Sequence, residues 1–205
     1  MTAQPKQRYT LEEYLELDRN SDARLEYWDG EIFDMSGVSK EHADIEVNLI
    51  MQLGPQLRRK GCHIFPANIR LKVPSMPPYR YGDTSALCGQ AKFEKIGGVD
   101  VLTNPQLIIE VLSYSTEGYD RGDKFSNYKS IPSFCEYLLI AQHRLHVTQY
   151  VKQAANLWNQ REFDQMDDVV KLVSLNCELV LRDIYENVNF APPTVAPTFE
   201  SPNQL

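Results

Sequence analysis

The sequence lacks both a long apolar segment and an excess of positive charge. No run approaches the roughly 20 apolar residues that a membrane-spanning helix needs. The N-terminal stretch MTAQPKQRYTLEEY has no apolar core of the signal-peptide type, so we expect a cytoplasmic protein without a membrane segment. The formal net charge of −7 excludes a broad basic surface for a polyanion. Any contact with nucleic acid is therefore expected to be local, transient or assisted by a metal ion.

Cysteine is also sparse. Cys62, Cys88, Cys135 and Cys177 form no C-x-x-C pair and have no histidine at zinc-finger spacing. This pattern argues against a structural zinc site and, in a reducing compartment, against disulfides. We therefore expect buried or half-buried free thiols that behave as small apolar side chains.

Positive charge is instead gathered in three short groups. A solvated surface and a local anion-binding patch are both open interpretations of each group. The groups are Arg58 to Lys60, Arg70 with Lys72, and Arg121 with Lys124 and Lys129.

The first third of the chain carries clear helix and turn signals. Thr10 and Glu13 have the spacing of a capping box, which predicts a helix to about Asp18. Asp29-Gly30 predicts the turn of a β-hairpin. Apolar residues recur every four positions between residues 45 and 57, which predicts a helix from 39 or 40 to 60 that Gly61 terminates.

The remaining pattern is mostly that of strands. Alternation predicts one half-buried strand over 65–73 and a second over 81–87, followed by a loop with Gly97-Gly98. A buried strand at 107–112, a helix at 120–131 and a buried strand at 134–141 follow. Two more strands are predicted near 145–151 and 169–175, then a short amphipathic element at 179–185.

This order predicts an α/β fold in the broad sense, an α+β mixed sheet flanked by helices, and not a strictly alternating arrangement. We expect one domain over residues 9–190, a flexible N-terminus over 1–8, and a disordered proline-rich tail over 191–205.

Glu110 lies within the apolar run LIIEVL. A run of this kind is typical of a strand covered on both faces, where an uncompensated carboxylate is costly. Glu110 therefore either points into water at the edge of the sheet or faces a cleft where a partner needs it.

Two other charged residues suggest such partners. Asp83 begins a strand that follows the half-buried one, and Lys124 opens the helix after Glu110. Two carboxylates from neighbouring strands can hold a divalent cation such as Mg²⁺ through oxygen ligands. A lysine beside them can orient water and stabilise charge on a phosphate. Taken alone, these spacings also fit an edge glutamate or one paired with a basic neighbour.

Ordered blocks from about Tyr9 to Val188 make the chain recognisable. It resembles the Uma-type family of restriction-endonuclease-like proteins, within the PD-(D/E)XK nuclease superfamily. The residues that carry the resemblance are Tyr9 to Tyr14, Leu25-Glu26-Tyr27, Asp29 to Ile32, Ser36-Gly37, His42, Tyr81-Gly82-Asp83, Leu102 to Pro105, Glu110 to Ser113, Ser115-Thr116, Tyr119 to Lys124, Tyr128, Ile131 to Ser133, and Glu136-Tyr137.

The resemblance implies a restriction endonuclease-like core with a metal site at one end. Asp83 and Glu110 match the two metal-binding acids, and Lys124 matches a catalytic lysine displaced onto the following helix. Glu26 matches an acidic residue contributed from the N-terminal part. His42 matches a recurring histidine and is a further candidate, with no assigned role.

The chain departs from the superfamily pattern at three positions. Leu112 occupies the place of the lysine two residues after the second acid, Gly82 replaces the proline expected before Asp83, and Tyr114 stands where such sequences often carry proline. A glycine loosens the backbone, so weaker metal affinity is one expected effect at position 82.

The resemblance implies a Mg²⁺-dependent endonuclease, with Mn²⁺ as a second candidate ion, acting on DNA through weak or transient contact, as a homodimer. In this interpretation Glu26 helps to hold a second ion or its water. The alternative is a nuclease fold that serves as a binding or assembly module without turnover, since a fold does not establish an activity. No base-reading motif is present, so target specificity stays open.

Overall fold

A computed structural model describes residues 8–35 and 37–190. The flexible N-terminus and the proline-rich tail predicted from the sequence therefore lie, except for Arg8, outside the described residues. No helix of the described part of the chain combines the length and apolar character needed to cross a bilayer.

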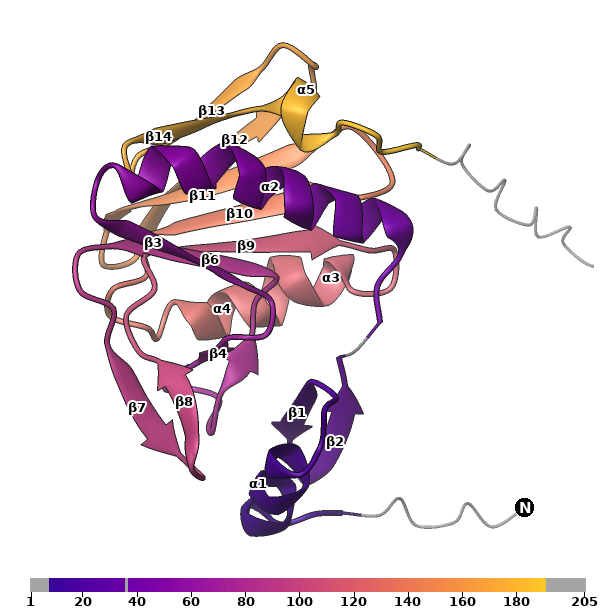
Figure 1. Ribbon diagram of the computed structural model, residues 1–205, viewed down its shortest axis with the longest axis vertical. Helices are drawn as coiled ribbons and strands as arrows, with labels where there is room; N and C mark the ends of the chain where they lie inside the picture. Colours follow the sequence, from indigo (N-terminus) through magenta and orange to yellow (C-terminus); the bar gives the residue numbers. More distant parts are fainter. Residues whose placement is uncertain (1–7, 36, 191–205) are drawn as a thin grey trace, which may run out of the picture.

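The centre of the fold is a six-stranded mixed sheet with helices on both faces (Figure 1). Its two central strands, β9 (Leu107–Leu112) and β10 (Glu136–Ala141), run parallel, and every other neighbouring pair is antiparallel. Helix α2 (Lys40–Arg58) lies on one face, and a helical segment of α3 (Glu117–Tyr119), η1 (Asp120–Lys124) and α4 (Phe125–Tyr128) lies on the other. The predicted mixed sheet flanked by helices is confirmed. The strand order is β12 (Leu157–Phe163), β11 (Val147–Ala154), β10 (Glu136–Ala141), β9 (Leu107–Leu112), β6 (Thr84–Cys88), β3 (Cys62–Pro66).

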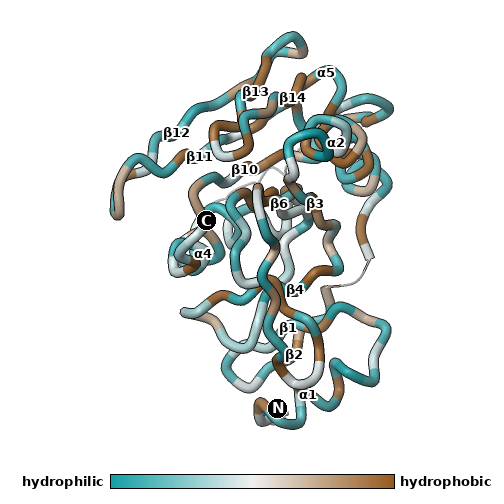
Figure 2. Tube along the Cα trace, turned by 60° about the vertical axis from the view of Figure 1, so that its left-hand side comes forward, coloured by the Kyte–Doolittle hydropathy of each residue, from teal (hydrophilic) through white to brown (hydrophobic). Residues whose placement is uncertain are grey.

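Strand β9 is buried along its whole length and divides the core into two layers. Ile109 and Val111 pack in the cluster that contains the apolar face of α2, and hydrophobic residues recur along that helix in Figure 2. Ile108 and Leu112 pack in the second cluster, with Phe125 and other residues of the opposite layer. Because side chains alternate along a strand, Glu110 shares the face of Ile108 and Leu112. Glu110 therefore points toward the α3–α4 layer.

A smaller four-stranded sheet lies below the main one in Figure 1, beside the N-terminal helix and hairpin. Tyr14, Tyr79 and Val101 form the buried centre of this region. On the other side of the molecule, a hairpin and a short helix complete the core cluster around α2. The small sheet has the order β5 (Arg80–Tyr81), β4 (Arg70–Leu71), β8 (Val99–Leu102), β7 (Phe93–Ile96); the other elements are α1 (Leu11–Arg19), β1 (Leu25–Trp28), β2 (Glu31–Asp34), β13 (Val169–Leu172), β14 (Cys177–Val180) and α5 (Leu181–Ile184).

The local signals near the N-terminus are confirmed. The Glu13 amide donates to Thr10 Oγ1 at 3.2 Å, and the Thr10 amide donates to Glu13 Oε2 at 2.7 Å, which completes the capping box. Asp29 and Gly30 have φ values of 42° and 80°, as the turn of a two-residue hairpin requires. Helix α2 ends at Arg58, close to the predicted position.

Several strand predictions are wrong in their boundaries. The single strand predicted over 65–73 is two strands, β3 and β4, which belong to different sheets. The strand predicted over 81–87 is interrupted at Gly82-Asp83, between β5 and β6. Gly97-Gly98 lies in a turn, as predicted, but the two strands that flank it, β7 and β8, were not predicted.

The helix predicted over 120–131 is observed as a helical segment over 117–128 with a π-helical turn at its centre. The five residues of η1 separate α3 from α4, and the helical segment ends at Tyr128. Both Asp120 and Lys124 are buried on this turn. Single π-helical turns inside α-helices are frequent at functional sites.

The expectation of free thiols is wrong for two of the four cysteines. Cys62 on β3 and Cys88 on β6 form a disulfide. The two residues are direct partners in the antiparallel register of these strands, so the fold brings their sulfur atoms together. Cys135 and Cys177 are free, as expected.

Candidate active site

A cavity of about 630 Å³ lies at the carboxyl end of β9, beside the first turn of α2. The carboxyl ends of sheet strands are a common location for ligand sites in proteins that contain parallel strands. The cavity is lined by His42, Asp83, Glu110, Asp120 and Lys124 together with the residues that follow β9. Four of the five site residues predicted from the sequence therefore line this cavity: His42, Asp83, Glu110 and Lys124.

The environment of Glu110 answers the question raised by its apolar sequence. Glu110 is 2% exposed, and each of its carboxylate oxygens accepts a hydrogen bond. Lys124 Nζ donates to Oε2 at 2.8 Å, and the Tyr128 hydroxyl donates to Oε1 at 2.8 Å. Lys124 Nζ also lies 3.3 Å from Asp120 Oδ1. Glu110 thus faces a cleft and is compensated by an ammonium group and a phenol.

Burial and charge act in opposite directions on this pair. Burial raises the pKa of Glu110 well above its usual value, and the nearby Lys124 ammonium opposes that rise. Burial lowers the pKa of Lys124, but the carboxylates of Glu110 and Asp120 outweigh it and raise this pKa well above its usual value. Lys124 is therefore a cation at neutral pH. It can stabilise negative charge but cannot accept a proton.

Asp83 is fixed at the interruption between β5 and β6. The Val111 amide, on the neighbouring strand, donates to Asp83 Oδ2 at 2.7 Å. A Cβ atom at Gly82 would lie 3.0 Å from Ile108 Cγ2 and 3.4 Å from Glu110 Oε1, so there is little room for a side chain there. Gly82 therefore allows the Asp83 segment to approach β9 closely. The prediction from the sequence considered only that glycine loosens the backbone, and it did not include this close packing.

His42 and Glu46, one turn apart on α2, extend the site toward the other layer. His42 Nε2 lies 3.4 Å from Asp83 Oδ2 and 3.4 Å from Glu46 Oε1. Burial lowers the pKa of His42, but hydrogen bonding and charge from Asp83 and Glu46 raise it to about 9. For Asp83 the burial effect is again the largest and raises the pKa, while His42 and Lys124 lower it to a net value below the usual one.

The same three side chains fit a divalent metal ion. One ligand atom from each of His42, Glu46 and Asp83 lies within 4.8 Å of the others. Beyond these 3.4 Å ion contacts, His42 Nε2 and Glu46 Oε1 are buried without a well-formed hydrogen bond in the described structure, so a cation at this point would satisfy both atoms. Carboxylate oxygens suit Mg²⁺ and Mn²⁺, and an imidazole nitrogen favours transition metals. The sequence did not single out Glu46, although its position four residues after His42 was a readable signal.

Glu26 has a different environment. Its Oε1 accepts a hydrogen bond from the Tyr81 amide at 2.7 Å, and its Oε2 lies 3.8 Å from Arg80 Nε. Glu26 is 6% exposed and does not belong to the described lining of the cavity. It holds the backbone two residues before Asp83.

Comparison with known proteins places this geometry in context. Residues 11–182 match the family described as "Uma2: Putative restriction endonuclease". The crystal structure of a "putative nuclease belonging to DUF820" from Anabaena variabilis superposes with a TM-score of 0.70, over 88% of this chain and 99% of that chain. Its sequence is 19% identical, so this similarity concerns the fold.

Two proteins of a Synechocystis strain are similar in sequence. The uncharacterized protein slr1290 is 30% identical over 91% of this chain and 96% of its own length. The uncharacterized protein sll1609 is 34% identical over 73% of this chain and 84% of its own length. Neither name assigns an activity.

Proposed function

Because this chain belongs to the Uma2 family of restriction-endonuclease-like proteins, we propose that it is a metal-dependent endonuclease that hydrolyses phosphodiester bonds in DNA. One observation carries the proposal. Two of the three candidate metal ligands, His42 and Asp83, line the same cavity as the buried Lys124–Glu110 pair, and the third, Glu46, lies beside His42. A metal site beside a fixed ammonium is an arrangement suited to phosphoryl transfer.

The proposal gives the side chains separate roles. Asp83 would hold a Mg²⁺ or Mn²⁺ ion together with His42 and Glu46, and Glu110 is a further candidate ligand; the ion would supply a Lewis acid and an activated water. Lys124, which stays protonated, stabilises the negative charge that builds on the phosphate. Glu26 holds the backbone that carries Asp83.

The overall charge limits how DNA is held. A net charge of −7 opposes contact over a wide area, so the bound ion and local cations are expected to provide most of the attraction. We retain a homodimer in the proposal because two copies of the site would serve the two strands of a duplex. Light scattering coupled to size-exclusion chromatography measures that assembly directly.

The test combines metal binding with DNA nicking. We expect calorimetry to show binding of Mg²⁺ or Mn²⁺ to the wild type, and a supercoiled plasmid to be nicked in the same buffers. Asp83→Asn should lose both. Asp123→Asn, an exposed acid next to Lys124 in the sequence, is the matched control and should retain both. A wild type that binds neither ion at millimolar concentration contradicts the proposal.

The second candidate function is a binding or assembly module. The observation that favours it is the closed hydrogen bonding of Glu110, whose two oxygens are already held by Lys124 and Tyr128. Metal binding that depends on Asp83, without cleavage of DNA or RNA in either ion, would support this alternative.

A further inference from the structure

Tyr114 lies at the rim of the cavity with most of its surface in water. Its side chain is 70% exposed, although its chain neighbours Ser113 and Ser115 line the cavity. The ring stacks on His143, with 4.0 Å between the ring centroids and 28° between their planes. A tyrosine that is exposed yet held in one orientation offers a flat aromatic surface to a partner.

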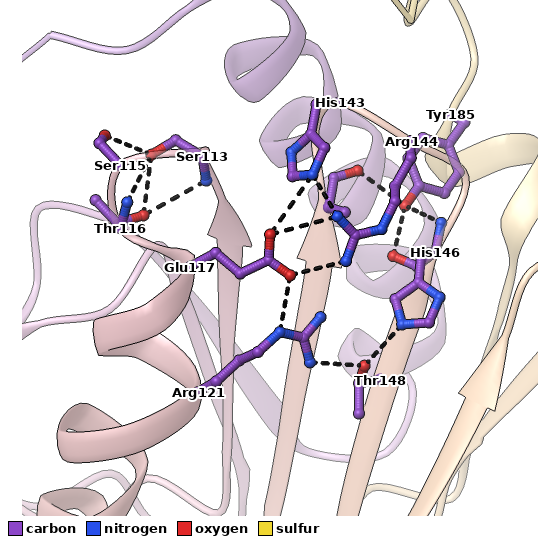
Figure 3. Close-up of polar contacts among 11 residues, drawn as sticks. Ser113, Ser115, Thr116, Glu117, Arg121, His143, Arg144, His146, Thr148 and Tyr185 are labelled. Carbon is purple, nitrogen blue, oxygen red and sulfur yellow. Dashed lines mark hydrogen bonds and ion pairs between the residues drawn. The ribbon is translucent and has the colours of Figure 1, made fainter. Parts of the chain in front are cut away.

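Hydroxyl groups connect this tyrosine with the proposed catalytic centre. Ser113 Oγ lies 3.0 Å from both Ser115 Oγ and Thr116 Oγ1, and all three residues line the cavity (Figure 3). Hydroxyls donate to phosphate oxygens without regard to base sequence. A strand that leaves the site toward Tyr114 therefore passes a row of donors.

Two arginines beside the tyrosine supply local positive charge. Arg121 Nε lies 2.9 Å and Arg144 Nη2 lies 2.8 Å from the same oxygen of Glu117, so two cations share one carboxylate (Figure 3). The second oxygen of Glu117 lies 3.5 Å from His143 Nε2, which links this cluster to the Tyr114 stack. Arg144 is 46% exposed in its side chain, so it can reach a phosphate while Arg121 stays on Glu117.

The histidine under Tyr114 is suited to stacking. Burial, followed by the charge of Arg144, lowers the pKa of His143, so its ring is neutral at neutral pH. Arg121 and Arg144 together carry one positive charge more than the single negative charge of Glu117 offsets, and His143 adds none. The combination of an aromatic platform and a small positive excess is typical of sites that bind a single nucleic-acid strand.

We propose that Tyr114 stacks on an unpaired base of the DNA substrate while Arg144 contacts a phosphate of the same strand, so that the substrate class is DNA with unpaired nucleotides. This inference rests on the proposed function and specifies its substrate. In a continuous duplex both faces of each base are covered by neighbouring base pairs, so the platform is useful only where a base has left the stack.

Binding to labelled oligonucleotides tests the inference without relying on cleavage. Fluorescence anisotropy is measured in Ca²⁺ with a fluorescein-labelled single strand and with the blunt duplex of the same sequence, and the DNA is checked to be intact afterwards. We expect tighter binding of the single strand. Tyr114→Ala should weaken that binding by about fivefold or more, the effect of losing one base stack, and should leave duplex binding unchanged.

Three further variants separate the effect of stacking from the effect of charge and from the non-specific effect of removing an exposed aromatic side chain. Tyr114→Phe keeps the ring and should retain the affinity of the wild type. Phe93→Ala removes another exposed aromatic side chain, on β7 in the small sheet, and should have no effect. Arg144→Gln should lower the slope of log Kd against log salt concentration by about the amount that the loss of one phosphate contact produces.

The outcomes distinguish this inference from the proposed nuclease function. Equal or tighter binding of the blunt duplex, absence of DNA binding, or a Tyr114→Ala variant that behaves like Phe93→Ala overturns the inference. If Asp83-dependent nicking is nevertheless observed, the nuclease function stands without it. If Tyr114-dependent binding of single strands occurs without nicking, the inference about the strand stands and the nuclease function fails.

Discussion

Lys124 Nζ on the π-helical turn lies 2.8 Å from Glu110 Oε2 on the central strand β9. The contact joins the α3–α4 layer to the sheet, and each group makes the burial of the other tolerable. A buried ion pair of this kind adds little net stability, because its desolvation offsets its attraction, but the loss of one partner leaves an uncompensated charge. The pair is thus a sensitive point for both stability and activity.

Replacing Lys124 tests that coupling. Lys124→Met should lower the free energy of unfolding by about 3 kcal/mol, because it leaves Glu110 and Asp120 buried beside an apolar chain. It should also lower the nicking rate by about a hundredfold or more. Urea unfolding and plasmid nicking measure the two effects. The double variant Glu110→Gln/Lys124→Met should recover part of the stability, because only Asp120 then stays buried without its cation, and none of the activity; a double variant no more stable than Lys124→Met contradicts the argument.

Gly82 should tolerate no side chain. Gly82→Ala places a Cβ atom 3.0 Å from Ile108 Cγ2 and 3.4 Å from Glu110 Oε1, so we expect a loss of about 1–3 kcal/mol in unfolding free energy and weaker metal binding. Gly54→Ala is the matched control, since nothing lies within 4 Å of its Cβ and an alanine within helix α2 should stabilise the protein. Equal unfolding midpoints for the two variants would refute the packing argument.

The ion contacts of His42 predict a pH dependence of stability in metal-free protein. Its pKa is raised to about 9 in the folded chain, above the ordinary value of 6.5. The contribution of His42 to the free energy of unfolding is therefore fully present below pH 6.5 and is lost as the pH rises through about 9. Its upper limit is about 3 kcal/mol. Urea unfolding in EDTA across this range should show a smaller decline for His42→Gln than for the wild type. His63→Gln, at an exposed position, should decline like the wild type.

The disulfide should stabilise the edge of the main sheet. Cys62 and Cys88 are 26 residues apart, and opening a loop of this length is expected to cost up to about 3.5 kcal/mol. Dithiothreitol should lower the urea midpoint of the wild type to that of the Cys62→Ser/Cys88→Ser variant, which should not respond to the reductant. Cys135→Ser serves as the control. A wild type without any response to reductant would show that the two thiols do not form the bond in solution.

The sequence was informative wherever one local signal determined one local structure. The capping box at Thr10 and the hairpin turn at Asp29-Gly30 need only near neighbours, so they were readable. The apolar run around Glu110 predicted a buried strand, and its exception pointed to the cleft. The approach of Lys124 to Glu110 was expected from the family resemblance, and the structure brings the two together.

The sequence was less informative wherever the outcome depended on register or exposure. Residues 65–73 alternate as one strand does, but a turn after Pro66 sends the two halves to different sheets. Strand β12 is mostly exposed at the sheet edge, so it shows no alternation that a sequence pattern could reveal. The pairing of Cys62 with Cys88 depends on the register of two antiparallel strands, which cysteine spacing does not encode.

The assembly of the cavity from three layers has a consequence for the timing of its formation. His42 comes from α2, Asp83 from the segment between β5 and β6, Glu110 from β9, and Lys124 from the helical segment on the opposite face. During translation these parts leave the ribosome in that order, and the parallel neighbour β10 that flanks β9 follows the last of them. A nascent or truncated chain therefore has no complete centre. The cavity can therefore form only after most of the domain has been synthesised.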